Sequence, residues 1–183
     1  MVRINRVTTR GGDKGETSLG DGTRVRKDDP RIAAIGEVDE ANATIGVLRR
    51  VTRDAPEISA MLARIQNDLF DLGADLCVPG LANDRLRLTD AQVLRLEQEV
   101  TDMNAALPPL TSFILPGGSE AAAHAQIARA VARRAERAVT AVPEVNPVLL
   151  RYLNRLSDHL FVLGRVLNDN GATDILWVPG ANR

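Results

Sequence analysis

The residues best suited to chemistry lie in one arginine-rich run, residues 128–137. In a helix of about 3.6 residues per turn, four charged residues of this run share one face: Arg129, Arg133, Glu136 and Arg137. The opposite stripe is apolar and is expected to be buried; it comprises Ile127, Val131, Ala138 and Val142. Because a guanidinium makes paired hydrogen bonds to phosphate at a fixed charge, the run predicts a site for a polyanion.

A second candidate site is the glycine-rich segment Thr8–Thr17. Glycines at positions 11, 12 and 15 permit positive φ, which lets successive N–H groups turn inward around an anion, while Lys14 adds a positive charge. The segment is not a Walker A loop, since Glu16 follows its last glycine, and no βαβ unit surrounds it. An ordinary turn remains the alternative, because such glycine clusters are common in turns.

The composition indicates a single domain, residues 1–183, with a sizeable core: 44% of the residues are hydrophobic. A net charge of -1 and 3% aromatic residues argue against a general nucleic-acid binder. The first ten residues hold three arginines and no long apolar run, so we expect no signal peptide, no membrane span and a cytoplasmic location. Any anion site must therefore be local.

The sequence divides into a loop segment (1–27), a helical bundle (28–170) and a tail (171–183). Capping residues, apolar spacing and helix breakers predict five helices. They run from Pro30 to about Arg50, from about Pro56 to before Pro79, from the Thr89 cap to before Pro108, from the Ser119 cap onward, and from the Asn146 cap to Gly171. Short connections between five helices predict an all-α bundle.

Bundles of this kind can hold two-metal centres, which need Glu-x-x-His pairs. Ala121 and Leu156 stand three residues before His124 and His159, so neither histidine belongs to such a pair. We therefore expect no ferritin-like iron site and no metal ligands from the protein.

Four separated motifs, in order, carry a resemblance to a known family. They are 9–17 (TRGGDKGET), 36–40 (GEVDE), 113–118 (FILPGG), and the pair 133–137 (RRAER) with 152–158 (YLNRLSD). The chain resembles the cobalamin adenosyltransferases of the PduO type, which transfer the 5'-deoxyadenosyl group of ATP to cob(I)alamin. The resemblance extends over nearly the whole chain.

The resemblance implies a ferritin-like five-helix bundle that forms a homotrimer, with ATP bound between subunits by the N-terminal glycine-rich segment of one chain and helices of the next. The residues implied to contact ATP are Thr9, Arg10, Gly12, Asp13, Lys14, Gly15, Thr17, Lys27, Arg133, Glu136 and Asn154. ATP would be used with Mg²⁺, held largely by phosphate oxygens.

The family pattern also implies residues for catalysis and for the corrinoid. Arg133 would stabilise the leaving triphosphate, and Arg129 would pair with Asp39 across the subunit interface. Phe113 and Asp39 would lie at the cobalamin, where Phe113 could exclude the lower axial ligand and ease reduction of the metal. From the residues alone, Arg129 and Asp39 could equally be a structural pair and Phe113 a core aromatic, and the role of Trp177 in the tail is undecided.

The implied reaction needs no protein nucleophile, because cob(I)alamin itself attacks C5' of ATP. The activity would also involve a reductase and an enzyme that uses adenosylcobalamin, which the sequence does not identify. The alternatives are a non-enzymatic bundle that senses ATP or chaperones cobalamin, and a purely structural bundle.

Overall fold

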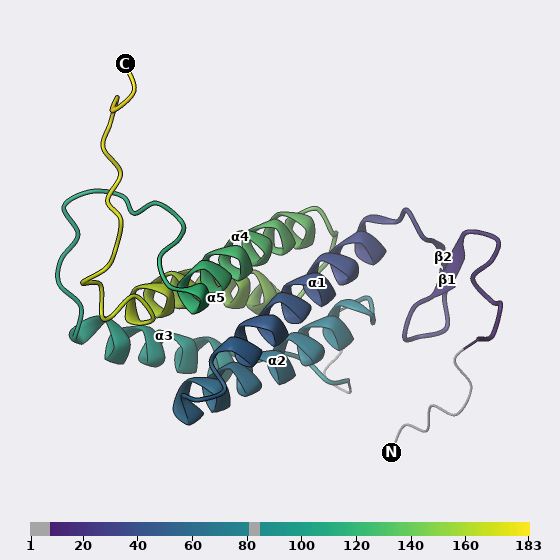
Figure 1. Ribbon diagram of the computed structural model, residues 1–183. Helices are drawn as coiled ribbons and strands as arrows, with labels where there is room; N and C mark the ends of the chain where they lie inside the picture. Colours follow the sequence, from purple (N-terminus) through teal and green to yellow (C-terminus); the bar gives the residue numbers. More distant parts are fainter. Residues whose placement is uncertain (1–7, 81–84) are drawn as a thin grey trace.

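A computed structural model describes residues 8–80 and 85–183. Over these residues the chain forms five long helices and one small hairpin (Figure 1). The helices are α1 (Pro30–Val51), α2 (Pro56–Leu76), α3 (Asp90–Ala105), α4 (Glu120–Thr140) and α5 (Pro147–Val166), and the hairpin strands are β1 (Glu16–Ser18) and β2 (Arg24–Arg26). The predicted all-α five-helix bundle is confirmed.

The predicted capping residues begin the helices as expected. The side chain of Asp29 accepts a hydrogen bond from Arg31 N at 2.8 Å at the start of α1. Ser119 Oγ does the same for Ala122 N in α4 at 3.1 Å, and Asn146 Oδ1 for Val148 N in α5 at 3.1 Å. Each bond satisfies one of the N–H groups that a helix start leaves without a partner within the helix.

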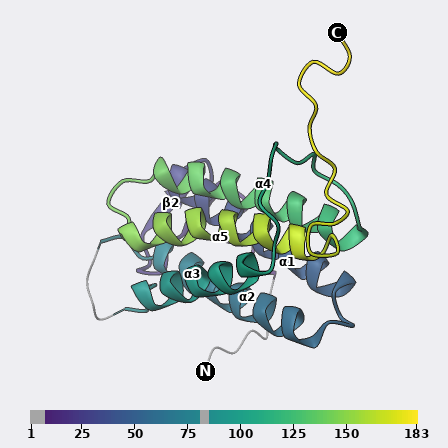
Figure 2. The ribbon, with the colours of Figure 1, turned by 90° about the vertical axis from the view of Figure 1, so that its left-hand side faces the viewer.

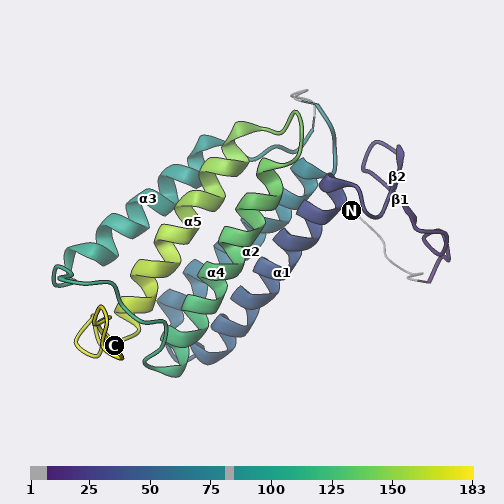
Figure 3. The ribbon, with the colours of Figure 1, turned by 90° about the horizontal axis from the view of Figure 1, so that it is seen from above.

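The helices lie side by side, with α4 between α1 and α5 (Figures 2 and 3). Helix α3 packs on α5 and α2 packs on α1. All five helices contribute to the core between them, and α2 and α5 supply a row of fully buried leucines, among them Leu62, Leu69, Leu72, Leu153, Leu156 and Leu160. The apolar spacing predicted for these two helices is therefore the buried face.

The expectation that Ile127 is buried was wrong. Its side chain is 53% exposed, whereas Ala125, Ala128, Ala132 and Ala135 form the buried stripe of α4. Small residues let α4 approach α1 and α5 closely, so the face that carries them is the one that packs. Ile127 precedes Ala128 by about 100° of helix rotation and turns outward.

The N-terminal segment differs from the predicted loop because it contains the β1–β2 hairpin. Asp21 and Gly22 lie at its turn, where Asp21 Oδ1 accepts a hydrogen bond from Thr23 N at 2.9 Å and Gly22 has a φ of +89°. Asp-Gly is a known hairpin signal, so this element could have been predicted. The hairpin is anchored by Leu19, which is buried, and by Gly20 N, which donates to Cys77 O at 2.8 Å.

Within the part of the chain that the structure describes, no helix is both long enough and apolar enough to cross a membrane.

Candidate functional site

The charged face of α4 is joined to α5 by a direct contact. Asn154 Nδ2 donates to Glu136 Oε1 at 3.0 Å, so two residues predicted for the same site meet in the fold. Arg133 lies one turn before Glu136 and is exposed, and Arg137 Nη1 donates to Arg133 O at 3.0 Å. The arrangement presents arginines, a carboxylate and an amide on one surface.

The arginines of this face are only partly neutralised. Arg129 Nε donates to the neutral amide oxygen of Gln126 at 2.9 Å. Burial, together with the like charge of Arg133, lowers the pKa of the Arg129 guanidinium. Among the described residues, the Arg133 guanidinium has no carboxylate partner within ion-pair distance. A bound anion would relieve this repulsion, which is what a phosphate-binding surface requires.

Arg134 has a different role, which the sequence reasoning missed. It forms ion pairs with Glu40 and with Glu37, the latter at 2.5 Å, and so ties α4 to α1. The hydrogen bonds from Glu40 and Glu37 raise the pKa of the Arg134 guanidinium. Glu37 and Glu40 stand three residues apart, which puts them on one face of α1 and could have suggested a shared partner.

The glycine-rich segment folds into a tight loop before β1. Arg10 and Gly15 have φ values of +60° and +79°. Lys27, which directly follows β2, closes the loop: its N–H donates to Gly15 O at 2.9 Å, and its side chain passes close to Gly12. A Cβ at Gly12 would lie 2.9 Å from Lys27 Nζ, so any larger residue here would push the flexible end of the Lys27 side chain away from the loop.

Most of the side chains predicted to contact ATP are exposed on this loop. Asp13 and Lys14 are exposed, and Thr17 is half-buried on β1. Thr9 Oγ1 accepts a hydrogen bond from Gly11 N at 3.5 Å. Arg24 was not predicted for the site, yet its Nη2 donates to Gly11 O at 3.0 Å and holds the loop on the hairpin.

The loop and the charged face of α4 are not joined within one chain. No hydrogen bond or ion pair between described residues links 9–17 or Lys27 to Arg133, Glu136 or Asn154. The hairpin lies beyond the end of the bundle where α1 begins, and α4 ends toward the same side (Figures 1 and 3).

The segment between α3 and α4 lies at the other end of the bundle (Figure 1), and Phe113 within it is not a core residue, since its side chain is 78% exposed. Its segment pairs with the tail: Leu115 N donates to Ile175 O at 2.8 Å and Trp177 N donates to Phe113 O at 2.7 Å. The Phe113 and Trp177 rings are 6.2 Å apart between centroids. The tail thus packs against the Phe113 segment, which the sequence left undecided.

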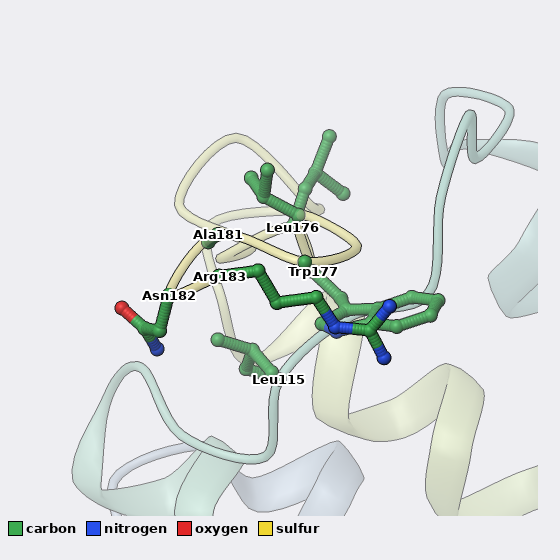
Figure 4. A pocket seen from close by; sticks show the side chains of 8 residues that line it. Leu115, Leu176, Trp177, Ala181, Asn182 and Arg183 are labelled. Atoms are coloured by element: carbon green, nitrogen blue, oxygen red, sulfur yellow. The ribbon is translucent and has the colours of Figure 1, made fainter.

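The paired segments border a cavity of about 470 Å³ between Leu115 and the last residues of the tail (Figure 4). Apolar side chains dominate its walls, including those of Leu176 and Trp177, and the Arg183 side chain also lines it. This end therefore offers an apolar surface, in contrast to the charged surface of α4 and α5.

Asp39 lies exposed on α1 and lines a cavity of about 320 Å³ with Phe70, which is 70% exposed. Arg129 lines a separate cavity of about 340 Å³ with Ile127 and Pro116. Each member of the predicted Arg129–Asp39 pair thus stands beside a large, uncovered apolar side chain.

No group of three or more His, Cys, Asp or Glu side chains among the described residues could hold a metal ion. His159 is fully buried, and its Nε2 lies 3.0 Å from Glu99 Oε2. It acts as a packing residue between α5 and α3.

The fold and these surfaces define a helical bundle with an exposed cationic surface suited to phosphates and a separate apolar end. The sequence profile of the cobalamin adenosyltransferase family matches residues 7–167. The chain belongs to the cobalamin adenosyltransferase family.

Relatives of similar length support this membership. The chain is 51% identical over 180 residues to a cobalamin adenosyltransferase of Cupriavidus metallidurans, covering 96% of this chain and 95% of the relative. It is 48% identical over 190 residues to a corrinoid adenosyltransferase of Mycobacterium tuberculosis (strain ATCC 25618 / H37Rv), covering 100% and 97%.

A solved structure has the same fold. A variant of the PduO-type ATP:corrinoid adenosyltransferase from Lactobacillus reuteri, complexed with cobalamin and ATP, superposes with a TM-score of 0.87 at 34% identity. The match covers 94% of this chain and 99% of that one.

Proposed function

We propose that this protein transfers the 5'-deoxyadenosyl group of ATP to cob(I)alamin, forming adenosylcobalamin and releasing triphosphate. The observation that carries the proposal is the contact between Asn154 and Glu136 beside Arg133, whose charge no carboxylate of the described chain neutralises. Its family relatives are named corrinoid adenosyltransferases, and the solved structure of a variant relative is complexed with cobalamin and ATP.

In this reaction the cobalt of cob(I)alamin supplies an electron pair to C5' of ATP. The Co–C bond forms as the C5'–O bond breaks, and triphosphate leaves with the electron pair of that bond. Negative charge grows on the departing oxygen, and Arg133 and Lys14 are the protein groups we assign to stabilise it. The protein therefore acts by orientation and electrostatics rather than as a nucleophile.

The glycine-rich segment is the part we assign to the ATP phosphates. Thr9, Arg10, Gly12, Asp13, Lys14, Gly15, Thr17 and Lys27 gather on one loop and its adjoining strands. Mg²⁺ bound to ATP would neutralise phosphate charge, and the protein residues would then fix the position of the phosphate chain.

We further propose a homotrimer with ATP between subunits. The charged face of α4 and the glycine-rich loop belong to one proposed site but share no hydrogen bond or ion pair among the described residues of one chain, so we assign one of them to a neighbouring chain. The exposed Ile127 beside Arg129 and the exposed Phe70 beside Asp39 give two apolar surfaces for that interface, across which Arg129 and Asp39 would pair.

At the apolar end, we assign Phe113 to the corrinoid face, with Asp39 reaching it from the neighbouring subunit. An exposed phenyl ring costs free energy in water unless a ligand covers it, which supports a ligand-facing role. Reduction to cob(I)alamin needs an electron donor, so a reductase is a proposed partner, as is an enzyme that uses the product. The proposed compartment is the cytoplasm.

An anaerobic assay with ATP and chemically reduced cobalamin tests the transfer. We expect the absorption spectrum of cob(I)alamin to convert to that of the alkylated cofactor, with one triphosphate released per product. ATP binding without consumption would instead support a cobalamin chaperone or nucleotide sensor, and an unchanged melting temperature on adding ATP would support a structural bundle.

A further inference from the structure

The Phe113 segment and the tail have little apolar packing to hold them. Phe113, Leu115, Ile175, Leu176, Trp177 and Val178 are all exposed. A two-stranded pairing of this size is at best marginally stable in water by itself. Something else must fix these segments to the bundle.

Three polar residues at the end of α5 and the start of the tail provide that attachment. Arg165 and Asn168 are 4% and 5% exposed, and the Asp174 side chain is equally buried. Arg165 Nε donates to Asp174 Oδ2 at 2.8 Å, and Asn168 Nδ2 donates to Asp174 Oδ1 at 3.1 Å. One carboxylate oxygen of Asp174 is thus bonded to the last turn of α5 and the other to Asn168, just beyond the end of that helix.

The same residues also hold the Phe113 segment at both of its ends. Arg165 Nη2 donates to Pro108 O at 2.8 Å, five residues before Phe113. Asn168 Oδ1 accepts from Ser119 N at 3.0 Å, six residues after it. We call Arg165, Asn168 and Asp174 the polar anchor.

Gly118 shows how closely this loop passes over the polar anchor. A Cβ at Gly118 would overlap the side-chain amide of Asn168, and the φ of Gly118 is +96°. Gly118 of the FILPGG motif therefore serves the anchor as well as the turn, since only glycine lets the loop lie directly on Asn168 at this position.

We propose that the polar anchor is a positioning device for the corrinoid: Arg165, Asn168 and Asp174 fix the segment carrying Phe113 and its partner strand in the tail. The proposal rests on the function proposed above, in particular on Phe113 facing the corrinoid. Asn168 and Asp174 lie beyond the family match, which ends at residue 167.

The position of the anchor predicts a selective effect. Ser119 begins α4, and Arg133 lies fourteen residues further along it, about 20 Å at 1.5 Å per residue. Loosening the anchor should therefore disturb corrinoid binding and leave ATP binding nearly unchanged.

The test compares Asn168→Ala and the shape-conserving Asp174→Asn with Asn104→Ala, a change at an exposed asparagine of α3. We expect both anchor variants to keep wild-type helical circular dichroism. The KM for cob(I)alamin should rise about tenfold while that for ATP changes less than about twofold, because a displacement of about 1 Å suffices to misplace a bound reactant. Asn104→Ala should match the wild type.

Trp177 is the only tryptophan of the chain, so its fluorescence reports on the tail without any substrate. We expect acrylamide quenching of Trp177 to increase about twofold in both anchor variants, because the paired segments then open locally. Gly118→Ala presses on the same contact, so the increase in Trp177 quenching in the double variant should be less than the sum of the increases from Gly118→Ala and Asn168→Ala. The strain of alanine at a φ of +96° remains in both backgrounds.

Three results would overturn the proposal: unchanged Trp177 quenching in both anchor variants, an equal rise of both KM values, or an unchanged corrinoid KM in a variant whose Trp177 has become accessible. Phe113→Ala, measured in parallel, separates this proposal from the one on which it rests. A wild-type corrinoid KM in Phe113→Ala would refute the role of Phe113 itself, whatever the anchor variants do to Trp177.

Discussion

The two ends of the bundle hold their exposed loops in opposite ways. At one end, the hairpin contains one buried side chain, Leu19, and is joined to the end of α2 by one backbone bond from Gly20 to Cys77, whereas the glycine-rich loop beyond it leaves its charged groups exposed. At the other end, buried polar side chains clamp a segment whose apolar groups are exposed. The first arrangement suits a loop completed by a neighbouring subunit and an anion, whereas the second suits a preformed apolar platform.

The largest expected effect comes from removing the positive charge of Arg133, on the charged face of α4. Arg133→Ala should lower kcat about 100- to 1,000-fold, because a preorganised donor to the leaving triphosphate is lost. The anaerobic transfer assay measures this, with size-exclusion chromatography to verify the oligomer. Arg50→Ala, a change at an exposed arginine of α1, is the matched control. Full turnover by Arg133→Ala would refute the assignment of Arg133 to the leaving triphosphate.

A smaller effect is expected from disturbing the loop at the same end. Gly12→Ala pushes against the side chain of Lys27 and should raise the KM for ATP about tenfold, as phosphate contacts are misplaced. At Gly11 a Cβ meets only ordinary contacts, so Gly11→Ala should behave as the wild type. Equal KM values for the two variants would mean that the close approach of Lys27 to Gly12 is irrelevant to ATP.

A buried contact between helices should affect the stability of the fold and not the binding of either substrate. Burial raises the pKa of Glu99, but hydrogen bonds from His159 and Arg64 outweigh it and bring the pKa below the ordinary 4.5. The unfolded chain then binds the proton more tightly than the folded one, so this contribution is present above pH 4.5 and is lost as the pH falls through the folded pKa.

Urea unfolding of Glu99→Gln between pH 3 and 7 measures this contribution. We expect a shallower decline of the unfolding free energy with acid than in the wild type, and no such change in Glu57→Gln, which alters an exposed residue of α2. The same acid sensitivity in Glu99→Gln and the wild type would remove Glu99 as the cause.

The smallest expected effect is at the exposed pair of Arg155 and Asp158, whose atoms lie 2.5 Å apart one helical turn from each other. Asp158→Ala should cost at most about 0.5 kcal/mol of unfolding free energy, since Arg155 keeps a second partner in Glu97 at 3.0 Å. Both KM values should stay at wild type. A change in the KM for ATP or for cob(I)alamin would show that Asp158 takes part in binding that substrate.

The fold was largely predictable because its signals are local. Caps such as Asp29 and Asn146 bond to N–H groups two residues away, and the leucine spacing of α2 and α5 repeats within each helix. The face of α4 was harder to predict, because alanines rather than Ile127 fill its contacts with α1 and α5. The sequence analysis did not predict the β1–β2 hairpin, although the dipeptide Asp21-Gly22 is a typical hairpin turn.

The candidate site was predictable as a set of residues but not as an arrangement. The motifs identify Arg133, Glu136 and Asn154, yet only the packing of α4 on α5 brings Asn154 to Glu136. Asp174 carries no motif, and its burial beside Arg165 follows from the path of the tail.

The sequence by itself determined the helices, their starting residues and the family, because capping and apolar spacing act over a few residues and the motifs are continuous. Only the tertiary structure decided that Arg134 pairs with α1 while Arg133 does not, that Phe113 is exposed, and that the tail returns to it. Those outcomes depend on contacts between residues far apart in the chain. A local sequence pattern does not specify which distant side chain a given residue will contact.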